Sequence, residues 1–170
     1  MRSERIFLIG LMGAGKSTVG RLLGHSLYWP YVDNDEGLEE MTSDDAVTLS
    51  LGEAGSLHNA EEAWVANLLQ VDRNYVGGLP GSIGDRPEQL LNVQNRGSVV
   101  YLRAQPGILA DRIAMDTSER PWLKDDPLAV LSDMFNRRDQ IFRESAHLVI
   151  DTDRAAAPDL ALEIAGWFTN

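Results

Sequence analysis

The stretch GLMGAGKST at residues 10–18 has the residue types and the spacing needed to bind a polyphosphate. It matches the pattern G-x-x-x-x-G-K-[ST] at Gly10, Gly15, Lys16 and Ser17. Glycines let the backbone approach an anion closely, so that successive N–H groups converge on the phosphates. The lysine supplies a mobile charge for the β- and γ-phosphates, and the serine hydroxyl is a hard oxygen ligand for Mg²⁺.

We therefore predict that this loop binds a nucleotide with Mg²⁺, and that Lys16 is also catalytic. The alternative is a chance match at a glycine-rich turn. It is disfavoured because a buried strand is expected before the loop and an amphipathic helix after it. The predicted nucleotide-binding residues are Gly13, Ala14, Gly15, Lys16, Ser17 and Thr18.

Two carboxylates follow in the sequence DND at residues 33–35. We expect Asp33, together with Ser17, to support Mg²⁺. We expect Asp35 to hold an acceptor hydroxyl and to take its proton, a role that suits a carboxylate within hydrogen-bond reach. The alternative is helix capping, because Asn34 or Asp35 followed by Glu36 is a usual helix start.

Strands alternate with helices along the whole chain, which predicts a parallel sheet covered by helices on both faces. The fold class is therefore α/β with three layers, in one domain over residues 1–170. A phosphate loop after the first strand lies at the carboxyl edge of such a sheet. The expected strands are 5–10, a short one within 28–35, 74–78, 97–104 and 147–152, and the expected helices are 17–27, 86–94, 106–115, 127–145, 157–168 and a broken stretch over 43–71.

A long polar segment, DTSERPWLKDD at residues 116–126, interrupts this compact pattern. Loops of this length are often lids, so we predict a lid here. A guanidinium that such a loop delivers neutralises charge on the transferring phosphoryl group, and closure excludes water. Arg120 is therefore a candidate catalytic residue, and a solvated loop charge is the alternative.

The composition excludes several classes of partner and site. The net charge is −11 over 170 residues, which disfavours binding to nucleic acid or to anionic lipid. The absence of cysteine excludes disulfides and thiolate metal sites. No segment approaches 18 consecutive apolar residues, so we expect no membrane association and a cytoplasmic location.

Four motifs taken together make the chain similar to shikimate kinases. They are the phosphate loop, the D-x-D at 33–35, the RPWL at 120–123 and the R-x-x-[LI]-[YF] of the late helix that begins at Arg138. The resemblance runs nearly end to end. It implies a fold like that of the nucleoside monophosphate kinases among the P-loop NTPases. It also implies a monomer that uses ATP and Mg²⁺ to phosphorylate the 3-hydroxyl of shikimate.

The resemblance also implies roles for individual residues. Asp33 supports Mg²⁺, Asp35 contacts the acceptor hydroxyls, Arg120 closes on the phosphates and Arg138 holds the acceptor carboxylate. Arg137 is an equal candidate by position for that last role. Arg112 and Arg154 correspond to residues that pack on adenine, and the helical region 34–62 corresponds to the acceptor-binding part.

The chain departs from the family pattern where the acceptor is expected to bind. In GEAGSLHNAEE, residues 52–62, Leu57 or His58 stands where the family has an arginine. The family's glycine triplet reads Leu79, Pro80, Gly81 here. Proline removes an N–H donor, and a lost arginine contact typically weakens a bound carboxylate by about 2–5 kcal/mol. His58 and Gly81 remain candidate acceptor contacts.

Three hypotheses are consistent with this sequence. The first is a shikimate kinase with a variant acceptor site. The second is a related kinase for a different, less anionic small hydroxyl compound. The third is a nucleotide-binding regulatory protein without turnover, which Asp35 and the predicted lid argue against. The first two share an ATP-dependent transfer of phosphate to a small-molecule hydroxyl.

Overall fold

The computed structural model describes residues 4–116, 121–123 and 126–170. In this part of the chain, five parallel strands form one sheet in the order β2-β3-β1-β4-β5. The strands are β1 (Arg5–Ile9), β2 (Tyr31–Asp33), β3 (Tyr75–Gly78), β4 (Ser98–Arg103) and β5 (Leu148–Asp151). The helices are α1 (Lys16–Leu27), α2 (Asn34–Thr42), α3 (Ala46–Leu51), α4 (Ser56–Leu68), α5 (Pro87–Gln94), α6 (Pro106–Ala114), α7 (Pro127–Ser145) and α8 (Ala157–Thr169), with short 3₁₀ helices η1 (Gly81–Asp85) and η2 (Pro121–Leu123).

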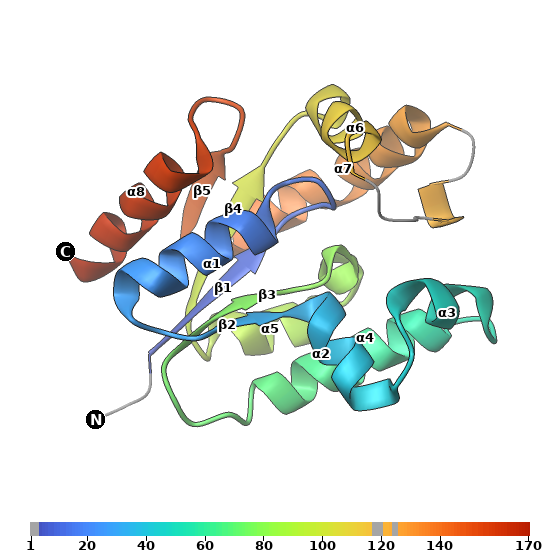
Figure 1. Cartoon of the computed structure of the whole chain (residues 1–170), viewed down its shortest axis with the longest axis horizontal. Helices are drawn as coiled ribbons and strands as arrows, with labels where there is room; N and C mark the ends of the chain where they lie inside the picture. The colour runs from blue at the N-terminus through green and yellow to red at the C-terminus, as the bar shows by residue number, and fades with distance from the viewer. Residues whose placement is uncertain (1–3, 117–120, 124–125) are drawn as a thin grey trace.

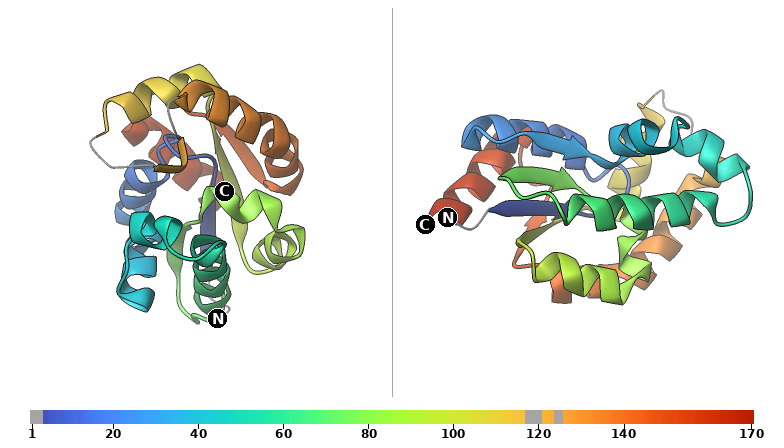
Figure 2. Two further views of the ribbon diagram at one scale, coloured as in Figure 1. Left: turned by 90° about the vertical axis from the view of Figure 1, so that its right-hand side faces the viewer. Right: turned by 90° about the horizontal axis from the view of Figure 1, so that it is seen from below.

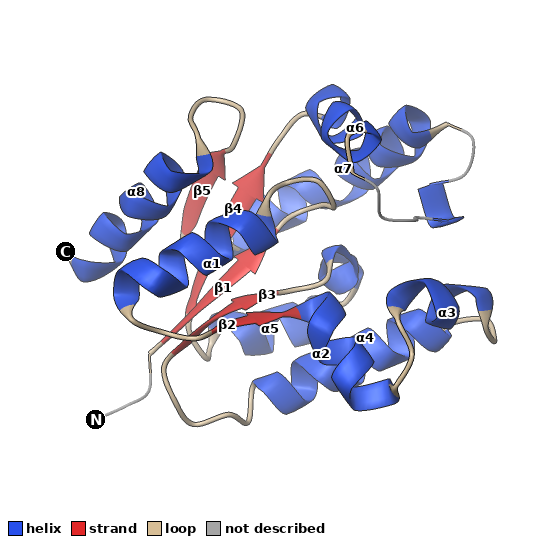
Figure 3. Cartoon of the chain, in the orientation of Figure 1, coloured by secondary structure: helices blue, strands red, loops and turns tan. Residues whose placement is uncertain are grey.

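Helices cover the sheet on both faces, as predicted (Figures 1 and 2). Helices α1 and α8 pack together on one face, and α5 and α7 lie on the other. The expected α/β class with three layers is therefore confirmed. Helices α2 and α3 gather beyond the edge strand β2 (Figure 3), whereas α4 reaches the face of β3, where a Cβ on Gly77 would lie 3.2 Å from Leu68.

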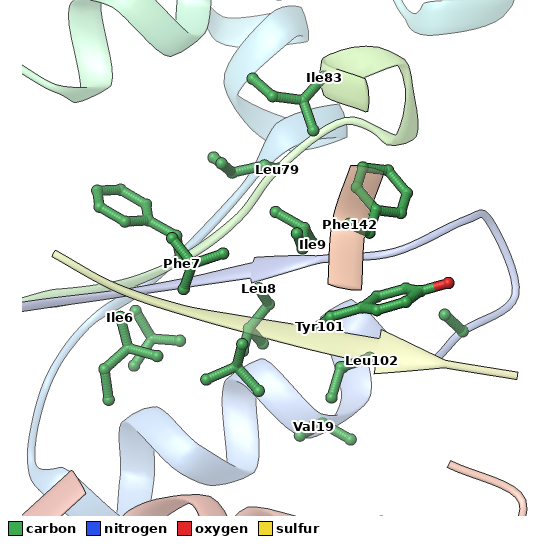
Figure 4. Packing of buried hydrophobic residues seen from close by; sticks show 14 of the residues in the cluster. Ile6, Phe7, Leu8, Ile9, Val19, Leu79, Ile83, Tyr101, Leu102 and Phe142 are labelled. Carbon is green, nitrogen blue, oxygen red and sulfur yellow. The ribbon is translucent and has the colours of Figure 1, made fainter. Parts of the chain in front are cut away.

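The central strand β1 forms the middle of the hydrophobic core. All five of its residues are buried, because it pairs with β3 on one side and β4 on the other. Side chains alternate across the sheet, as strand geometry requires. Ile6 and Leu8 point toward α1, whereas Phe7 and Ile9 point toward the face where Phe142 packs (Figure 4). This two-sided burial explains why the strand reads as an unbroken apolar run.

The strand order places the phosphate loop at a topological switch point of the sheet. The chain leaves β1 between two neighbours, β3 and β4, whose connections run to opposite sides. Such a position leaves a crevice at the carboxyl ends of the strands, where ligands bind in open α/β sheets. The fold therefore opens a site beside residues 10–18.

The boundaries of several elements differ from those expected. The stretch 43–71 is broken near Gly52 and Gly55, as predicted, giving α3 and α4. The 3₁₀ helix η1 was not expected, and only residues 31–33 of the stretch 28–35 form a strand. Residues 117–120 and 124–125 of the predicted lid, including Arg120, lie outside the described residues. Within that segment η2 contacts α3 and α7.

None of the helices in the described part of the chain combines the length and the apolar character needed to cross a bilayer.

Candidate active site

A cleft of about 850 Å³ lies at the carboxyl ends of β1, β2 and β3. Its lining joins segments that are far apart in the sequence. Residues 11–13 and 15–18 form one end, and the β2–α2 junction forms the middle. The start of α4, residues 78–82 and Arg138 of α7 form the other end. The nucleotide-binding and acceptor-binding residues predicted from the sequence therefore meet mostly in one cavity.

The phosphate loop adopts positive φ values, which favour glycine, at Gly10, Gly13 and Gly15. Gly10 has a φ of 148°, and a Cβ there would lie 2.4 Å from the carbonyl oxygen of Leu102. Gly15 is the N-cap of α1 with a φ of 97°. The Lys16 ammonium donates to the carbonyls of Gly10 at 2.7 Å and Leu11 at 3.2 Å. The loop thus wraps its lysine at the N-terminus of α1, where the helix dipole also favours an anion.

Ser17 and Asp33 come together as predicted for a shared role. The Ser17 hydroxyl donates to Oδ2 of Asp33 at 2.6 Å, and both residues line the cleft. Oδ1 of Asp33 accepts from the backbone N–H of Asp35 at 3.0 Å, so Asp33 is the N-cap of α2. Asp33 is therefore both the helix cap and the predicted Mg²⁺ ligand. The alternative cap positions, Asn34 and Asp35, lie within the helix.

Tyr31 is a member of this group that sequence reasoning missed. Its hydroxyl donates to the same Oδ2 of Asp33 at 2.9 Å. Burial, and then the neighbouring charge of Asp33, hold the pKa of the Tyr31 hydroxyl well above its usual range, so it remains a donor. The ring occupies space that glycine provides, because a Cβ at Gly20 or Gly78 would lie 2.1 Å from its atoms.

Asp35 lies in the first turn of α2, exposed to the cleft between the phosphate loop and the acceptor end. A carboxylate that lines a cleft can accept a proton from a hydroxyl bound there. Gly81 and His58 line the same cleft, the latter from α4. Leu57 and Pro80 line it as well.

A buried polar cluster closes the acceptor end. Glu61 accepts from the Ser82 hydroxyl, and the guanidinium of Arg86 lies 3.9 Å from Glu61. Arg86 also donates to Ser82 at 2.9 Å and to the carbonyl of His58 at 3.0 Å. Burial raises the pKa of Glu61 against the opposing contacts of Ser82, His58 and Arg86. The cluster ties α4 to η1 and α5, and no local sequence pattern marked it.

Arg138 is buried on α7 and lines the cleft, whereas Arg137 beside it pairs with Asp133 on the exposed surface. The structure therefore separates the two candidates that the sequence left equal. Arg138 is held by Asp85 of η1, whose role the sequence did not indicate.

The two predicted adenine contacts differ in position. Arg112 lines the cleft and bridges the phosphate loop to the segment after β5, donating to the carbonyl of Gly13 at 3.2 Å and to Thr152. Arg154 pairs with Glu163 of α8 and is not among the residues that line the cleft. Ala14, a predicted nucleotide contact within the loop, is buried.

Comparisons with known proteins agree with this geometry. The family model described as shikimate kinase matches residues 12–168. A shikimate kinase of Burkholderia pseudomallei is 40% identical over 170 residues, covering 95% of this chain and 91% of that protein. A shikimate kinase of Dechloromonas aromatica is 37% identical over 155 residues, covering 91% of this chain and 84% of that protein.

Solved structures show the same likeness in three dimensions. A shikimate kinase from Acinetobacter baumannii, in complex with shikimate, superposes with a TM-score of 0.89 at 30% identity, covering 98% of this chain and 93% of that one. A gluconokinase from Sinorhizobium meliloti, at 15% identity and a TM-score of 0.67, shares the fold alone. The predicted family is confirmed: this chain belongs to the shikimate kinase family, whose members are ATP-dependent small-molecule kinases.

Proposed function

We propose that this protein transfers the γ-phosphate of ATP to a hydroxyl of shikimate. The observation that carries the proposal is the single cleft in which the phosphate loop, Asp35 and Arg138 all take part. The loop that would hold the phosphoryl donor, the candidate base Asp35 and the buried cation Arg138 thus line one cavity. Its volume of about 850 Å³ suits a nucleotide tail and a small acceptor together.

The phosphate loop would hold the triphosphate of ATP. N–H groups of residues 13–15 and the N-terminus of α1 would bind the phosphate oxygens, together with Thr18. Lys16 would turn from its loop carbonyls toward the β- and γ-phosphates. Arg112, beside the loop, would lie toward the adenine, and Arg154 is the less supported candidate there.

Mg²⁺ fits beside the Ser17 hydroxyl and the Asp33 carboxylate, which are hard oxygen ligands. In the described ranges no three His, Asp or Glu side chains gather closely enough to hold a metal ion. When bound, Mg²⁺ neutralises charge on the β- and γ-phosphates.

Asp35 would accept the proton of the acceptor hydroxyl as its oxygen attacks the γ-phosphorus. The bond from that phosphorus to the bridging oxygen of ADP breaks, and ADP leaves. Lys16 stabilises the charge that collects on the transferring group and on ADP. Arg120, which lies outside the described residues, is proposed to add a second charge from the lid over residues 116–126.

A less anionic hydroxyl acceptor is the second candidate. Leu57, His58 and Pro80 line the acceptor end where the family pattern has an arginine and glycines. We propose His58, Gly81 and Arg138 as the acceptor contacts in either case. The remaining parts of the proposal are a monomeric, cytoplasmic enzyme with no nucleic-acid or membrane partner, in line with the net charge of −11.

The decisive test is ADP release from MgATP with and without millimolar shikimate, with the Asp35→Asn variant as the blank. We expect shikimate-dependent release in the unaltered protein and its loss by about 10³-fold in the variant. Nuclear magnetic resonance of phosphorus would identify the phosphorylated product. Release with a neutral cyclic polyol but not with shikimate would favour the second candidate. Nucleotide binding without ADP release in the presence of any acceptor would favour a regulatory protein.

A further inference from the structure

The guanidinium of Arg138 already has a carboxylate partner within the protein. Its Nε donates to Oδ1 of Asp85 at 3.0 Å, and its Nη2 donates to Oδ2. This is a bidentate contact on one edge of the fork, which is the strong form of such a pair. The Arg138 side chain is 7% exposed and that of Asp85 is 38% exposed.

Close packing fixes the position of Asp85. It ends η1, and the residue before it, Gly84, touches α7 directly. A Cβ on Gly84 would lie 2.9 Å from the ring of Phe142 and 3.1 Å from Cγ of Arg138. On the other side, Pro87 begins α5. The segment that carries the carboxylate is therefore packed against α7, next to the acceptor end of the cleft.

The edge of the fork that remains for a ligand faces the cleft. Nη1 of Arg138 lies 3.9 Å from the position that a Cβ would take at Gly81, and both residues line the cleft. A ligand carboxylate at this edge would meet a guanidinium whose charge Asp85 already balances. Although partial burial opposes it, Arg138 keeps the pKa of Asp85 below its usual range, so the carboxylate is ionised at neutral pH.

The second arginine at this end also has an acidic neighbour, because Nη2 of Arg86 lies 3.9 Å from Oε2 of Glu61. Asp35 and Asp45 add two further acids to the cleft lining. A buried cation without a partner is costly, and a ligand carboxylate that supplies the partner relieves that cost. When a carboxylate of the protein is already the partner of the cation, an acidic ligand gains less binding free energy from the same contact.

We propose that Asp85 is a specificity-determining residue, which weakens the binding of acceptors that carry a carboxylate and so lets neutral hydroxyl compounds compete for the site. This rests on the proposed function, in which Arg138 binds the acceptor carboxylate. Asp85 thereby sets how far the enzyme prefers an acidic acceptor over a neutral one of the same shape.

The test compares shikimate with its methyl ester, which has the same hydroxyls and no charge. Calorimetry in the presence of MgADP would measure the binding of each compound to the unaltered protein and to Asp85→Asn. Asparagine keeps an oxygen for Nε of Arg138 and removes the charge. We expect shikimate to bind about tenfold more tightly to the variant, and the ester and ADP to bind within about twofold of the unaltered protein.

Asp133→Asn is the matched control, because it removes the same charge from an exposed pair on α7 with Arg137. It should leave all three affinities unchanged. If Asp85→Asn fails to fold, as judged by its thermal transition, Asp85→Ser replaces it.

Two negative results are distinguishable. If the unaltered protein turns over shikimate, but the preference for acid over ester is unchanged or reduced in Asp85→Asn, then Asp85 does not weaken acid binding and the inference is wrong. In that case the proposed function stands. If neither protein binds or turns over shikimate while both bind ADP, the proposed function is wrong, and the role of Asp85 falls with it.

Discussion

The donor end and the acceptor end of the cleft are built in different ways. At the donor end, one short stretch of the chain, residues 11–13 and 15–18, supplies much of the cleft lining. At the acceptor end, side chains from α4, η1, α5 and α7 form ion pairs across long sequence distances, such as Arg138 with Asp85. A local loop can keep its function while its surroundings change. A site built from paired side chains can change its ligand preference when one member of a pair is replaced.

The largest expected effect concerns the donor end. Lys16→Ala removes the charge that meets the transferring phosphoryl group, so kcat/KM should fall by about 10³-fold with any acceptor. Coupled measurement of ADP release would show this, with Arg137→Ala as a control that removes an exposed charge. A loss seen only with acidic acceptors would contradict the assignment of Lys16 to the donor end.

The next effect concerns the acceptor end. Arg86→Ala leaves the buried Glu61 without its cation, so the free energy of unfolding at pH 8 should fall by about 2 kcal/mol. Acceptor affinity should fall as well, with ADP affinity unchanged. Denaturant unfolding and calorimetry would measure these quantities.

The loss of stability in Arg86→Ala should also depend on pH. Burial raises the pKa of Glu61, so the folded state binds more protons than the unfolded state. Stability from this group is therefore greatest at low pH, and it is lost as pH rises from the usual glutamate range through the raised pKa. Loss of Arg86 raises the pKa further, so the deficit should be larger at pH 8 than at pH 5. Equal deficits at both pH values would contradict a charge effect.

The smallest effect tests whether the donor end also depends on distant side chains. Tyr31→Phe removes one donor to Asp33, so the Mg²⁺ concentration for half-maximal tightening of ADP binding should rise about threefold. ADP binding in EDTA should be unchanged. Tyr75→Phe is the matched control, since its hydroxyl donates to the carbonyl of Leu68 away from the cleft. Equal changes with and without Mg²⁺ would mean that Tyr31 only supports the fold.

The sequence predicted the fold class and the place of the phosphate loop between a strand and a helix, because both depend on local patterns. The unbroken apolar run at 5–9 and the glycines of the loop each leave a readable signal. The break of the helical stretch at Gly52 and Gly55 was readable for the same reason. Tyr31 gave no signal, because only the pairing of β2 with β3 brings Gly78 under its ring.

The amino-acid sequence by itself determined that a phosphate loop follows a buried strand in a parallel α/β domain. Spacing along the chain is enough for this, since neighbouring N–H groups and alternating elements are local properties. Only the tertiary structure decided that Arg138 rather than Arg137 faces the cleft, and that Asp85 and Glu61 balance the acceptor-end arginines. Those choices depend on which helix face is buried and on which distant segment packs against it, and charge compensation between such segments has no period in the sequence.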